Sequence, residues 1–464
     1  MAIIGGGPGG YEAALVAAQL GADVTVVDSD GVGGSAVLTD CVPSKTLVAS
    51  ADVMVAVAAS PELGVRVGPG DPAPADPAAA PPRQVEGQPD RPAGSHPGVG
   101  VDLAAVHRRV LGLAQAQSDD IRHRLERDGV RIVAGRGRLD GSTRVVAEGP
   151  QGTSVIDADM VLVATGATPR ELPTAVPDGE RILTWTQVYA LTDVPERLVV
   201  VGSGVTGAEF ASAYHALGSD VVLVSSRDQV LPGQDADAAA VLEDVFARRG
   251  LTVLPRSRAV AAERSGDGVL VHLDDGRTVE GSHCLMAVGS IPNTTDLGLQ
   301  EAGVAVDERG FITVDRVSRT SARGVYAAGD CTGVLMLASV AAMQGRTAMW
   351  HALGDAVTPL DLTTVSSNVF TSPEIATVGW TQAMVERGDV QASVVTLPLA
   401  TNARAKMSGI HDGFVKVICR PGTGIVMGGV VVAPAASELI HPIALAVECR
   451  LTVDQVARAF TVYP

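Results

Sequence analysis

The sequence predicts an α/β protein in which two copies of one strand–turn–helix–strand unit are followed by a third, α+β domain. Three observations support this fold class. A glycine-rich turn stands twice between an apolar strand and an alanine-rich helix. In each copy 23 residues separate the first glycine from the residue that ends the second strand, 5 to 28 and 202 to 225. From about residue 363, alternating apolar residues at 413–418 and 429–432 precede a helix around 439–449.

The composition excludes several classes of function. The 464 residues are 46% hydrophobic, enough for two to four folded domains. A net charge of −17 argues against a nucleic-acid partner, because phosphate binding needs a basic stripe. No uninterrupted apolar run of about 18 residues appears, so we expect no membrane span. The five cysteines show no C-x-x-C spacing, so we expect no metal site and no disulfide framework, which fits the reducing cytoplasm.

The first copy combines a strand at 2–4, a glycine turn at 5–10, a helix to residue 20 and a strand at 23–28. Glycines in such a turn let the backbone approach a pyrophosphate at the helix N-terminus, where free amides favour negative charge. Asp28 ends the second strand and is suited to accept a hydrogen bond from a ribose 2′-hydroxyl, as FAD requires. The alternative is a glycine turn that only packs a helix on a sheet.

The second copy has a strand at 197–201, a turn at 202–207, a helix to 217 and a strand that ends at Ser225. Ser225 carries no carboxylate to repel a 2′-phosphate, and Arg227 follows closely. This second site therefore suits NADPH, NADH or both. Arg227 is equally well explained as a solvated loop charge.

Three predicted domains divide the chain. The FAD-binding domain covers 1–168 and 285–350, the NAD(P)-binding domain 169–284, and an interface or dimerisation domain 351–464. Within the first, residues 61–100 hold ten of the 27 prolines and predict a disordered insertion. Apolar residues at helical spacing predict a long amphipathic scaffold helix from about 102 to 128.

Several further motifs give the chain a family resemblance. They lie at 164–170 (ATGATPR), 287–293 (AVGSIPN), 325–330 (VYAAGD) and 370–374 (FTSPE), beside the two glycine turns and Glu209. With them the chain resembles the FAD-dependent pyridine nucleotide-disulfide oxidoreductases of the dihydrolipoamide dehydrogenase class over nearly its whole length apart from 61–100. The resemblance implies FAD and NAD(P)H as cofactors and a homodimer built through the third domain.

The resemblance and the glycine turns together predict the site residues. The FAD-binding residues are expected at Gly5, Gly7, Pro8, Gly10, Asp28, Gly33, Gly34, Cys41, Lys45, Gly137, Ala164, Thr165, Gly166, Gly329, Asp330, Leu337 and Ala338. The NAD(P)-binding residues are expected at Gly202, Ser203, Gly204, Val205, Thr206, Gly207, Glu209, Ser225, Arg227 and Gly289.

Four residues are expected to be catalytic. By resemblance, Lys45 lies beside the flavin in an ion pair with Glu209, where a cation stabilises developing negative charge. Cys41 lies against the flavin at a helix N-terminus, which favours a thiolate. An inert cysteine retained for packing explains Cys41 equally well. Tyr463 occupies the position of the family's acid–base histidine.

Two departures from the family pattern decide the expected reaction. Where the family has G-G-x-C-x4-C-x-P-S-K, the chain has Ala36 in place of the first cysteine, so an internal dithiol is chemically unavailable. Tyrosine, with a reference pKa of about 10, is a poor proton shuttle at neutral pH, so Tyr463 does not replace the histidine. The family's glutamate partner of that histidine lies beyond Pro464, and we expect the third domain to be truncated.

The intact flavin and nucleotide motifs predict hydride transfer from NAD(P)H and onward transfer of two electrons to a diffusible acceptor. Residues 35–41 resemble those of the disulfide-lacking actinobacterial branch of the class, which reduces quinones. We therefore expect an NAD(P)H quinone reductase. The alternatives are an FAD-dependent pyridine nucleotide transhydrogenase, which Ser225 permits, and a non-catalytic flavin-binding partner protein.

Overall fold

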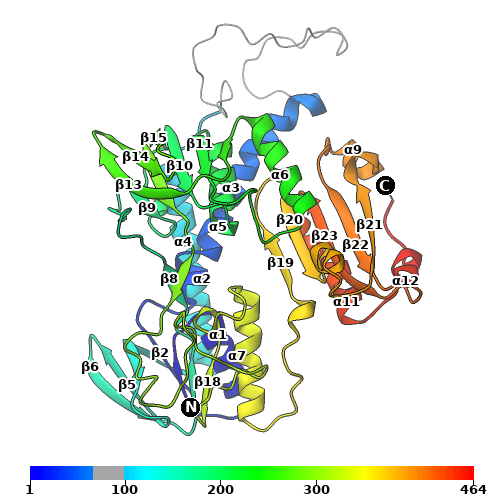
Figure 1. Ribbon diagram of the computed structural model, residues 1–464. Helices are drawn as coiled ribbons and strands as arrows, with labels where there is room; N and C mark the ends of the chain where they lie inside the picture. The colour runs from blue at the N-terminus through cyan, green and yellow to red at the C-terminus, as the bar shows by residue number, and fades with distance from the viewer. Residues whose placement is uncertain (66–98, 464) are drawn as a thin grey trace, which may run out of the picture. The chain divides into compact units, whose positions relative to one another are not determined.

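The computed structural model describes residues 1–65 and 99–463, which fall into two compact units (Figure 1). Unit 1 consists of Met1–Thr46, Arg108–Arg170 and Val288–Ser367, and unit 2 of the described parts of 47–107, 171–287 and 368–464. Most of the predicted insertion 61–100 lies outside the described residues. Its described start belongs to a 3-10 turn, η1 (Ser60–Leu63). The three-domain division with its boundaries stays a prediction.

A five-stranded parallel sheet in the order β18-β7-β1-β2-β3 forms the centre of unit 1. Its strands are β1 (Ala2–Ile4), β2 (Thr25–Asp28), β3 (Arg131–Ala134), β7 (Val161–Val163) and β18 (Val325–Ala327). Ile3 and Val26 pack into one buried apolar cluster, whereas Ile4 and Val27 pack into another. Both faces of the sheet are therefore covered, as parallel sheets require.

Two helices pack closely on the sheet of unit 1. They are α1 (Pro8–Gln19), which leaves the first glycine turn, and α7 (Ala338–Ala352). A Cβ atom at Gly345 of α7 would lie 2.1 Å from the carbonyl oxygen of Gly9 in α1. No side chain fits there, so glycine at this position lets the two helices approach each other.

Smaller elements complete unit 1. An antiparallel sheet consists of β4 (Arg136–Leu139), β5 (Arg144–Gly149) and β6 (Gly152–Asp157), and β8 (Ala167–Pro169) pairs with β17 (Ser290–Pro292). The short helical elements are α2 (Gly34–Leu38), η4 (Asp330–Thr332) and η5 (Leu362–Thr364). Helices α3 (Cys41–Ala59) and α4 (Leu103–Arg127) contribute residues to both units.

Unit 2 contains a second five-stranded parallel sheet, in the order β12-β11-β10-β16-β9. Its strands are β9 (Ile182–Thr184), β10 (Arg197–Val201), β11 (Asp220–Val224), β12 (Thr252–Leu254) and β16 (His283–Met286). The elements around it are η3 (Val188–Ala190), α5 (Val205–Leu217), α6 (Ala236–Arg249), β13 (Ala259–Ser265), β14 (Gly268–Leu273) and β15 (Thr278–Gly281). The repeated unit predicted from the sequence is therefore present in both sheets.

The C-terminal part of unit 2 is a mixed layer of strands and helices. Its sheet runs in the order β19-β20-β23-β22-β21. The strands are β19 (Ser366–Val369), β20 (Glu374–Gly379), β21 (Ser393–Pro398), β22 (Phe414–Cys419) and β23 (Val426–Ala433). The helices are α8 (Gln382–Glu386), η6 (Leu399–Thr401), α9 (Ala403–Met407), α10 (Ala436–Leu439), α11 (His441–Glu448) and α12 (Val453–Arg458). The predicted fold class, two Rossmann-like parts and an α+β part, is confirmed.

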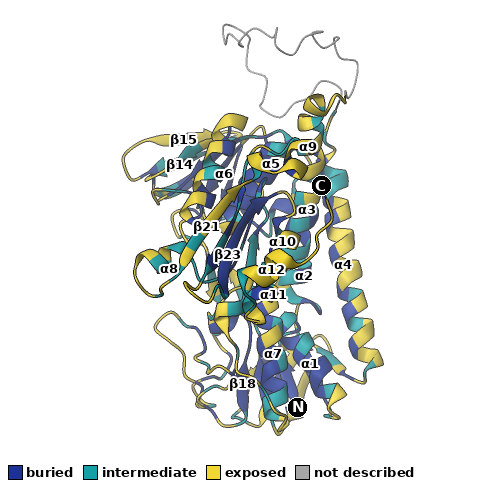
Figure 2. Cartoon of the chain, turned by 90° about the vertical axis from the view of Figure 1, so that its right-hand side faces the viewer, coloured by how far each residue is buried: buried dark blue, intermediate teal, exposed yellow. Residues whose placement is uncertain are grey.

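Burial follows the layers. Every residue of the central strand β23 is buried, whereas the edge strand β21 is mostly exposed (Figure 2). Helix α4 has the amphipathic character predicted for 102–128. Its buried stripe passes through Val110, Ala114 and Ser118 rather than Leu113, which is 43% exposed. The hydroxyl of Ser118 donates a hydrogen bond to the Val32 carbonyl at 2.5 Å, which ties α4 to the loop before α2.

One described segment, Gly34–Leu63, is long and apolar enough to cross a membrane by length and composition alone. About a third of its most apolar window is buried. The same test is passed by core helices of soluble proteins, and this segment comprises α2, α3 and η1 rather than one continuous helix. Charged Asp40, Lys45 and Asp52 interrupt it.

Candidate dinucleotide-binding sites

The first glycine turn connects β1 to α1 with no space for side chains. Gly5 has φ +100° and donates its N–H to the Val27 carbonyl at 2.8 Å. A Cβ atom at Gly10 would lie 1.9 Å from the Gly5 carbonyl oxygen. Gly7 caps α1 without any side-chain hydrogen bond, and Pro8 follows as its first residue. Pro8 has no N–H and the Gly10 N–H donates to the Gly7 carbonyl at 2.8 Å, so the Gly9 amide is the first-turn donor that remains available to an anionic group.

Asp28 holds this turn and the loop after β2 together. Its Oδ2 accepts a hydrogen bond from the Gly6 N–H at 2.6 Å, and its Oδ1 accepts from Asp30 at 2.9 Å and Gly31 at 2.6 Å. A carboxylate offers about four acceptor positions, so these bonds leave about one for a further donor. The predicted contact with a ribose hydroxyl is compatible with that remaining capacity.

Gly33 and Gly34 lie directly against the glycine turn. Gly33 donates its N–H to the Gly6 carbonyl at 2.8 Å. A Cβ atom at Gly34 would lie 2.7 Å from the Gly7 Cα. The start of α2 therefore closes one side of the α1 N-terminus, and two of the predicted FAD-binding segments meet there.

The Asp330 loop is held by a residue that the sequence did not single out. Gln344 of α7 is buried, and its Oε1 accepts a hydrogen bond from the Gly329 N–H at 2.8 Å. Its Nε2 donates to the Thr332 hydroxyl at 3.3 Å, and that hydroxyl donates to the Gly329 carbonyl at 2.7 Å. The available signal in the sequence was a glutamine in a predominantly apolar segment, 14 residues after the VYAAGD motif.

Asp330 itself carries a partly buried carboxylate. No hydrogen bond to its side-chain oxygens is formed within the described part of the chain. Burial, and secondly the negative charge of Asp40, raise the pKa of Asp330 to about 6. Such a group needs a donor to stabilise its ionised form, and a hydroxyl group of a bound ligand would supply one.

The remaining predicted FAD-binding residues of unit 1 lie around the sheet. Thr165 donates its hydroxyl to the Asn293 carbonyl at 2.7 Å, and Asn293 donates back to the Thr165 carbonyl at 2.9 Å. Gly137 lies in β4, where a Cβ would lie 3.0 Å from the Ile4 side chain, so glycine allows close packing there. The others are Ala164 at the end of β7, Gly166 with φ +68°, and Leu337 and Ala338 at the start of α7.

Cys41 and Lys45 lie one helical turn apart in the first turns of α3, and therefore on one face of that helix. The Lys45 ammonium donates to the Ser44 hydroxyl at 3.3 Å, and that hydroxyl donates to the Cys41 carbonyl at 3.4 Å. Ala36, which is expected to replace the family's first cysteine, lies in α2, and no disulfide joins any of the five cysteines.

The second glycine turn has nearly the same geometry in unit 2. Gly202 has φ +109° and donates its N–H to the Val224 carbonyl at 2.9 Å. A Cβ atom at Gly207 would lie 1.8 Å from the Gly202 carbonyl oxygen. Gly204 caps α5 without a side-chain bond, and the exposed Val205 and the half-buried Thr206 begin the helix.

Ser225 differs from Asp28 in what it contacts. It is fully buried, its hydroxyl lies 2.6 Å from that of Ser203, and it accepts a hydrogen bond from the Arg227 N–H at 3.1 Å. The Arg227 side chain is exposed. The serine hydroxyl therefore organises the loop after β11, while Arg227 is accessible at its surface.

Glu209 is buried in α5, and its Oε1 accepts a hydrogen bond from the backbone N–H of Phe370 at 2.9 Å. Gly289, the one predicted NAD(P)-binding residue that belongs to unit 1, has φ +94° and accepts a hydrogen bond from the Arg170 N–H at 2.9 Å. Tyr463 is 88% exposed near the end of the chain. Within residues 1–65 and 99–463, no group of three or more His, Cys, Asp or Glu side chains suited to a metal ion was found.

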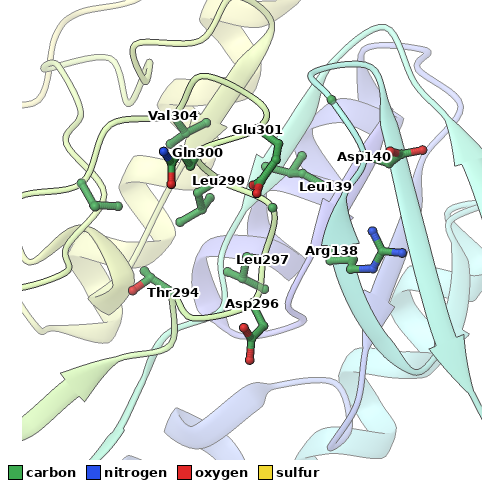
Figure 3. A pocket seen from close by; sticks show the side chains of 13 residues that line it. Arg138, Leu139, Asp140, Thr294, Asp296, Leu297, Leu299, Gln300, Glu301 and Val304 are labelled. Atoms are coloured by element: carbon green, nitrogen blue, oxygen red, sulfur yellow. The ribbon is translucent and has the colours of Figure 1, made fainter.

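A cavity of about 720 Å³ lies elsewhere in unit 1, between β4 with its following turn and the segment 294–306 (Figure 3). Figure 3 shows Arg138 and Asp140 on one side of it, and Leu299 and Gln300 on the other. None of the predicted site residues lines this cavity. It is therefore separate from the predicted dinucleotide sites.

The residues of unit 1 fit FAD. The uncapped N-terminus of α1 suits a pyrophosphate, and the remaining acceptor capacity of Asp28 suits a ribose. The partly buried carboxylate of Asp330 lacks a donor that a polyhydroxylated chain would provide. All seventeen residues predicted to bind FAD belong to this unit. Nine of the ten predicted to bind NAD(P) belong to unit 2.

Comparison with known families matches both parts of the chain. Residues 1–345 match the family described as pyridine nucleotide-disulphide oxidoreductase, and residues 365–464 match the dimerisation domain of the same family. Among curated relatives, an NAD(P)H dehydrogenase (quinone) of Mycobacterium tuberculosis is 53% identical over 472 aligned positions, covering 100% of this chain and 90% of the relative. A dihydrolipoyl dehydrogenase of Chlamydia trachomatis is 31% identical, covering 100% and 93%.

Solved structures give the same result. The crystal structure of LpdA from Mycobacterium tuberculosis superposes with a TM-score of 0.90 at 53% identity, covering 100% of this chain and 96% of that one. The HOCl-induced flavoprotein disulfide reductase RclA from Escherichia coli gives a TM-score of 0.83 at 22% identity, with the same coverage, and so shows likeness of fold alone.

Proposed function

Because the chain belongs to the pyridine nucleotide-disulphide oxidoreductase family, we propose that it is an FAD-dependent enzyme that carries electrons from NAD(P)H to a quinone. Its cofactors are FAD and NAD(P)H, and it is a homodimer through the family's dimerisation domain. When bound, FAD supplies the two-electron chemistry between the nicotinamide and the acceptor. Because no disulfide joins its cysteines, the protein is suited to the reducing cytoplasm, where we place it.

One observation carries the choice of acceptor. Ala36 in α2 stands where the family's thiol–disulfide exchange is expected to need a sulfur, which leaves Cys41 at the start of α3 as the one cysteine of these two helices. Electrons cannot leave through an internal dithiol, so the acceptor must itself take two electrons at the flavin site. A quinone does so, and the M. tuberculosis relative of 53% identity bears the name NAD(P)H dehydrogenase (quinone).

The remaining catalytic residues have roles that follow from charge and position. We propose that the Lys45 ammonium, on the same face of α3 as Cys41, supports negative charge that develops at the flavin. The Phe370 N–H occupies one carboxylate oxygen of Glu209, which fixes the orientation of that side chain. Cys41 contributes a thiol to the wall of the site.

In the proposed nucleotide site the amides at the start of α5 bind the pyrophosphate. The buried Ser203–Ser225 pair shapes the loop after β11, and Arg227 at its surface offers a cation to a 2′-phosphate. These features support binding of both NADPH and NADH.

The test is an anaerobic comparison of acceptors with the FAD-loaded enzyme. We expect NADPH and NADH oxidation to be fastest with a water-soluble benzoquinone, slower with thio-NAD⁺, and at background with lipoamide. Faster transfer to thio-NAD⁺ would favour the transhydrogenase that Ser225 permits. A bound flavin that NAD(P)H does not bleach would instead indicate a non-catalytic flavin-binding protein.

A further inference from the structure

Lys416 is a buried cation in the C-terminal part of unit 2. Its side chain on β22 is 1% exposed. The ammonium donates to both carboxylate oxygens of Asp235 at 2.8 Å each, to Asp237 Oδ2 at 2.7 Å and to Gln382 Oε1 at 2.6 Å. The Phe414 ring centroid lies 5.3 Å away. The residue is one of only three lysines in a chain with 32 arginines.

The energetics of such a group do not explain its presence by stability alone. Burying an ammonium carries a desolvation penalty, which a well-formed ion pair roughly offsets. Apolar residues of the same volume often serve stability as well or better. What Lys416 does specify is position, because its four contacts join β22, α8 and the start of α6 at one point. Figure 1 shows α6 beside the C-terminal sheet.

Asp235 connects Lys416 to the nucleotide-binding part of unit 2. It is the N-cap residue of α6, and its Oδ1 accepts hydrogen bonds from the Asp237 N–H at 3.1 Å and the Ala238 N–H at 3.2 Å. It is also the residue at which the loop after β11 ends. The same carboxylate therefore caps the helix, terminates the loop and binds Lys416.

The loop from Ser225 to Gln234 is held on its other side by the second glycine turn. Leu231, buried with φ +54°, donates its N–H to the Ser203 carbonyl at 2.8 Å. Val230 donates its N–H to Glu243 of α6 at 2.6 Å. A non-glycine residue at this φ is held in place by its surroundings rather than by local preference. The loop therefore takes its shape from Ser203 and from α6 together.

We infer that Lys416 is a positioning residue for the pyridine nucleotide, acting through Asp235 to hold the 225–234 loop against the glycine turn that binds it. The inference rests on the proposed function of this turn as the NAD(P)H site. Lys416 acts through Asp235 and not by touching the nucleotide. Its loss lets the start of α6 and the loop move, so the adenosine half of the nucleotide loses its preformed surface.

The experiment compares FAD-loaded wild type with Lys416→Met, which removes the charge at similar volume. Calorimetric titration with NADP⁺ and NAD⁺ and steady-state kinetics with a benzoquinone are measured together. We expect the Kd and the nucleotide KM to rise about tenfold while kcat at saturating nucleotide and quinone KM stay within about twofold. FAD content should not change.

Arg248→Ala is the matched control. Arg248 at the other end of α6 forms an ion pair with Asp412 at 2.6 Å, so it ties the same helix to the residues just before the same strand, away from the loop. Its loss should leave nucleotide Kd and KM unchanged. The double variant Asp235→Asn with Lys416→Met removes the unpaired buried carboxylate while keeping a capping side chain, and should fold even if Lys416→Met does not.

The outcomes separate the two hypotheses. Unchanged nucleotide affinity in a folded Lys416 variant, or equal losses in the Lys416 and Arg248 variants, would overturn the positioning role and leave the proposed function intact. A wild-type protein without measurable nucleotide affinity would overturn the proposed function, and the positioning role with it.

Discussion

The hydroxyl oxygens of Ser203 and Ser225 lie 2.6 Å apart at the end of the second glycine turn. In the first copy the equivalent positions are Gly6 and Asp28, and there a carboxylate oxygen accepts a hydrogen bond from the glycine N–H at 2.6 Å. A Cβ at Gly6 would approach the Asp28 carboxylate to 3.0 Å, so the larger group at the strand end requires the smaller one in the turn. The Gly6–Asp28 pair and the Ser203–Ser225 pair therefore fill the equivalent space in the two copies with different side chains.

Exchanging the pair should change nucleotide preference. In the double variant Ser203→Gly with Ser225→Asp, the second copy acquires the pairing of the first, and its carboxylate repels a 2′-phosphate. We expect kcat/KM for NADPH to fall about tenfold or more relative to that for NADH, since charge repulsion of this kind costs roughly 1–3 kcal/mol. Ser226→Ala, on the exposed part of the same loop, is the control. An unaltered NADPH/NADH ratio would contradict the proposed reading of this strand end.

Gln344→Leu should weaken FAD binding. The substitution leaves the buried Gly329 N–H without its acceptor, which costs about 1–3 kcal/mol, and removes the hydrogen bond that the Thr332 hydroxyl accepts. We expect FAD Kd to rise about tenfold and nucleotide Kd to stay unchanged, measured by flavin fluorescence and calorimetry. Gln115→Ala, an exposed glutamine on α4, should affect neither value. Equal FAD affinity in the two variants would return Gln344 to a packing role.

Ala36→Cys tests whether the scaffold still brings the two positions of the dithiol together. The variant has six cysteines. A disulfide between the new cysteine at position 36 and Cys41 would leave four titratable thiols. We expect that loss of two thiols under mild oxidation, counted with a thiol reagent in denaturant. Lipoamide reduction should remain at background because Tyr463 stands where the family has its acid–base histidine. Six free thiols would show that α2 and α3 hold the two positions apart.

Much of the fold was predictable because its signals are local. The spacing from Gly5 to Asp28 and from Gly202 to Ser225 lies within one strand–helix–strand unit, and the structure reproduces both units with matching registers. The same is true of the alternating strands β22 and β23. Side-chain patterns over 6 to 25 residues suffice for such elements.

The supporting contacts were not predictable from the sequence. Gln344 bonds to Gly329, which is 15 residues away in the sequence, and Lys416 bonds to Asp235, which is 181 residues away. Nothing in either local pattern specifies these partners, because tertiary packing selects them. The scarcity of lysine drew attention to Lys416 but gave no indication of its partners. In the same way, the contact between the Ser225 and Ser203 hydroxyls could not be foreseen, and the expected place of Ser225 at the nucleotide stays a prediction.

Tyr463→Phe tests whether the exposed tyrosine near the end of the chain takes part in acceptor reduction. Its side chain is 88% exposed in the single chain, and the resemblance predicts that it occupies the position of the family's acid–base histidine. We expect the quinone KM or kcat to change about two- to tenfold through loss of one hydroxyl. FAD content, measured by absorbance, should stay constant, as should nucleotide Kd. Val462→Ala, also exposed, serves as the control, and identical kinetics in both variants would leave Tyr463 without a part in the reaction.

Asp330 should make the stability of the apoprotein depend on pH. Burial and the Asp40 charge raise its pKa from 3.8 to about 6, so the folded state holds this proton more tightly than the unfolded state. The ionised side chain therefore destabilises the fold increasingly as pH rises from about 4 to 6, reaching at most roughly 3 kcal/mol above pH 6. Asp330→Asn removes this cost. We expect urea unfolding of the apoprotein to show the variant more stable than wild type at pH 7 and equal to it near pH 4. Asp40→Asn should give a smaller change of the same sign, since burial is the larger cause. A difference between Asp330→Asn and wild type that is constant across this range would mean that Asp330 already has a donor in the apoprotein.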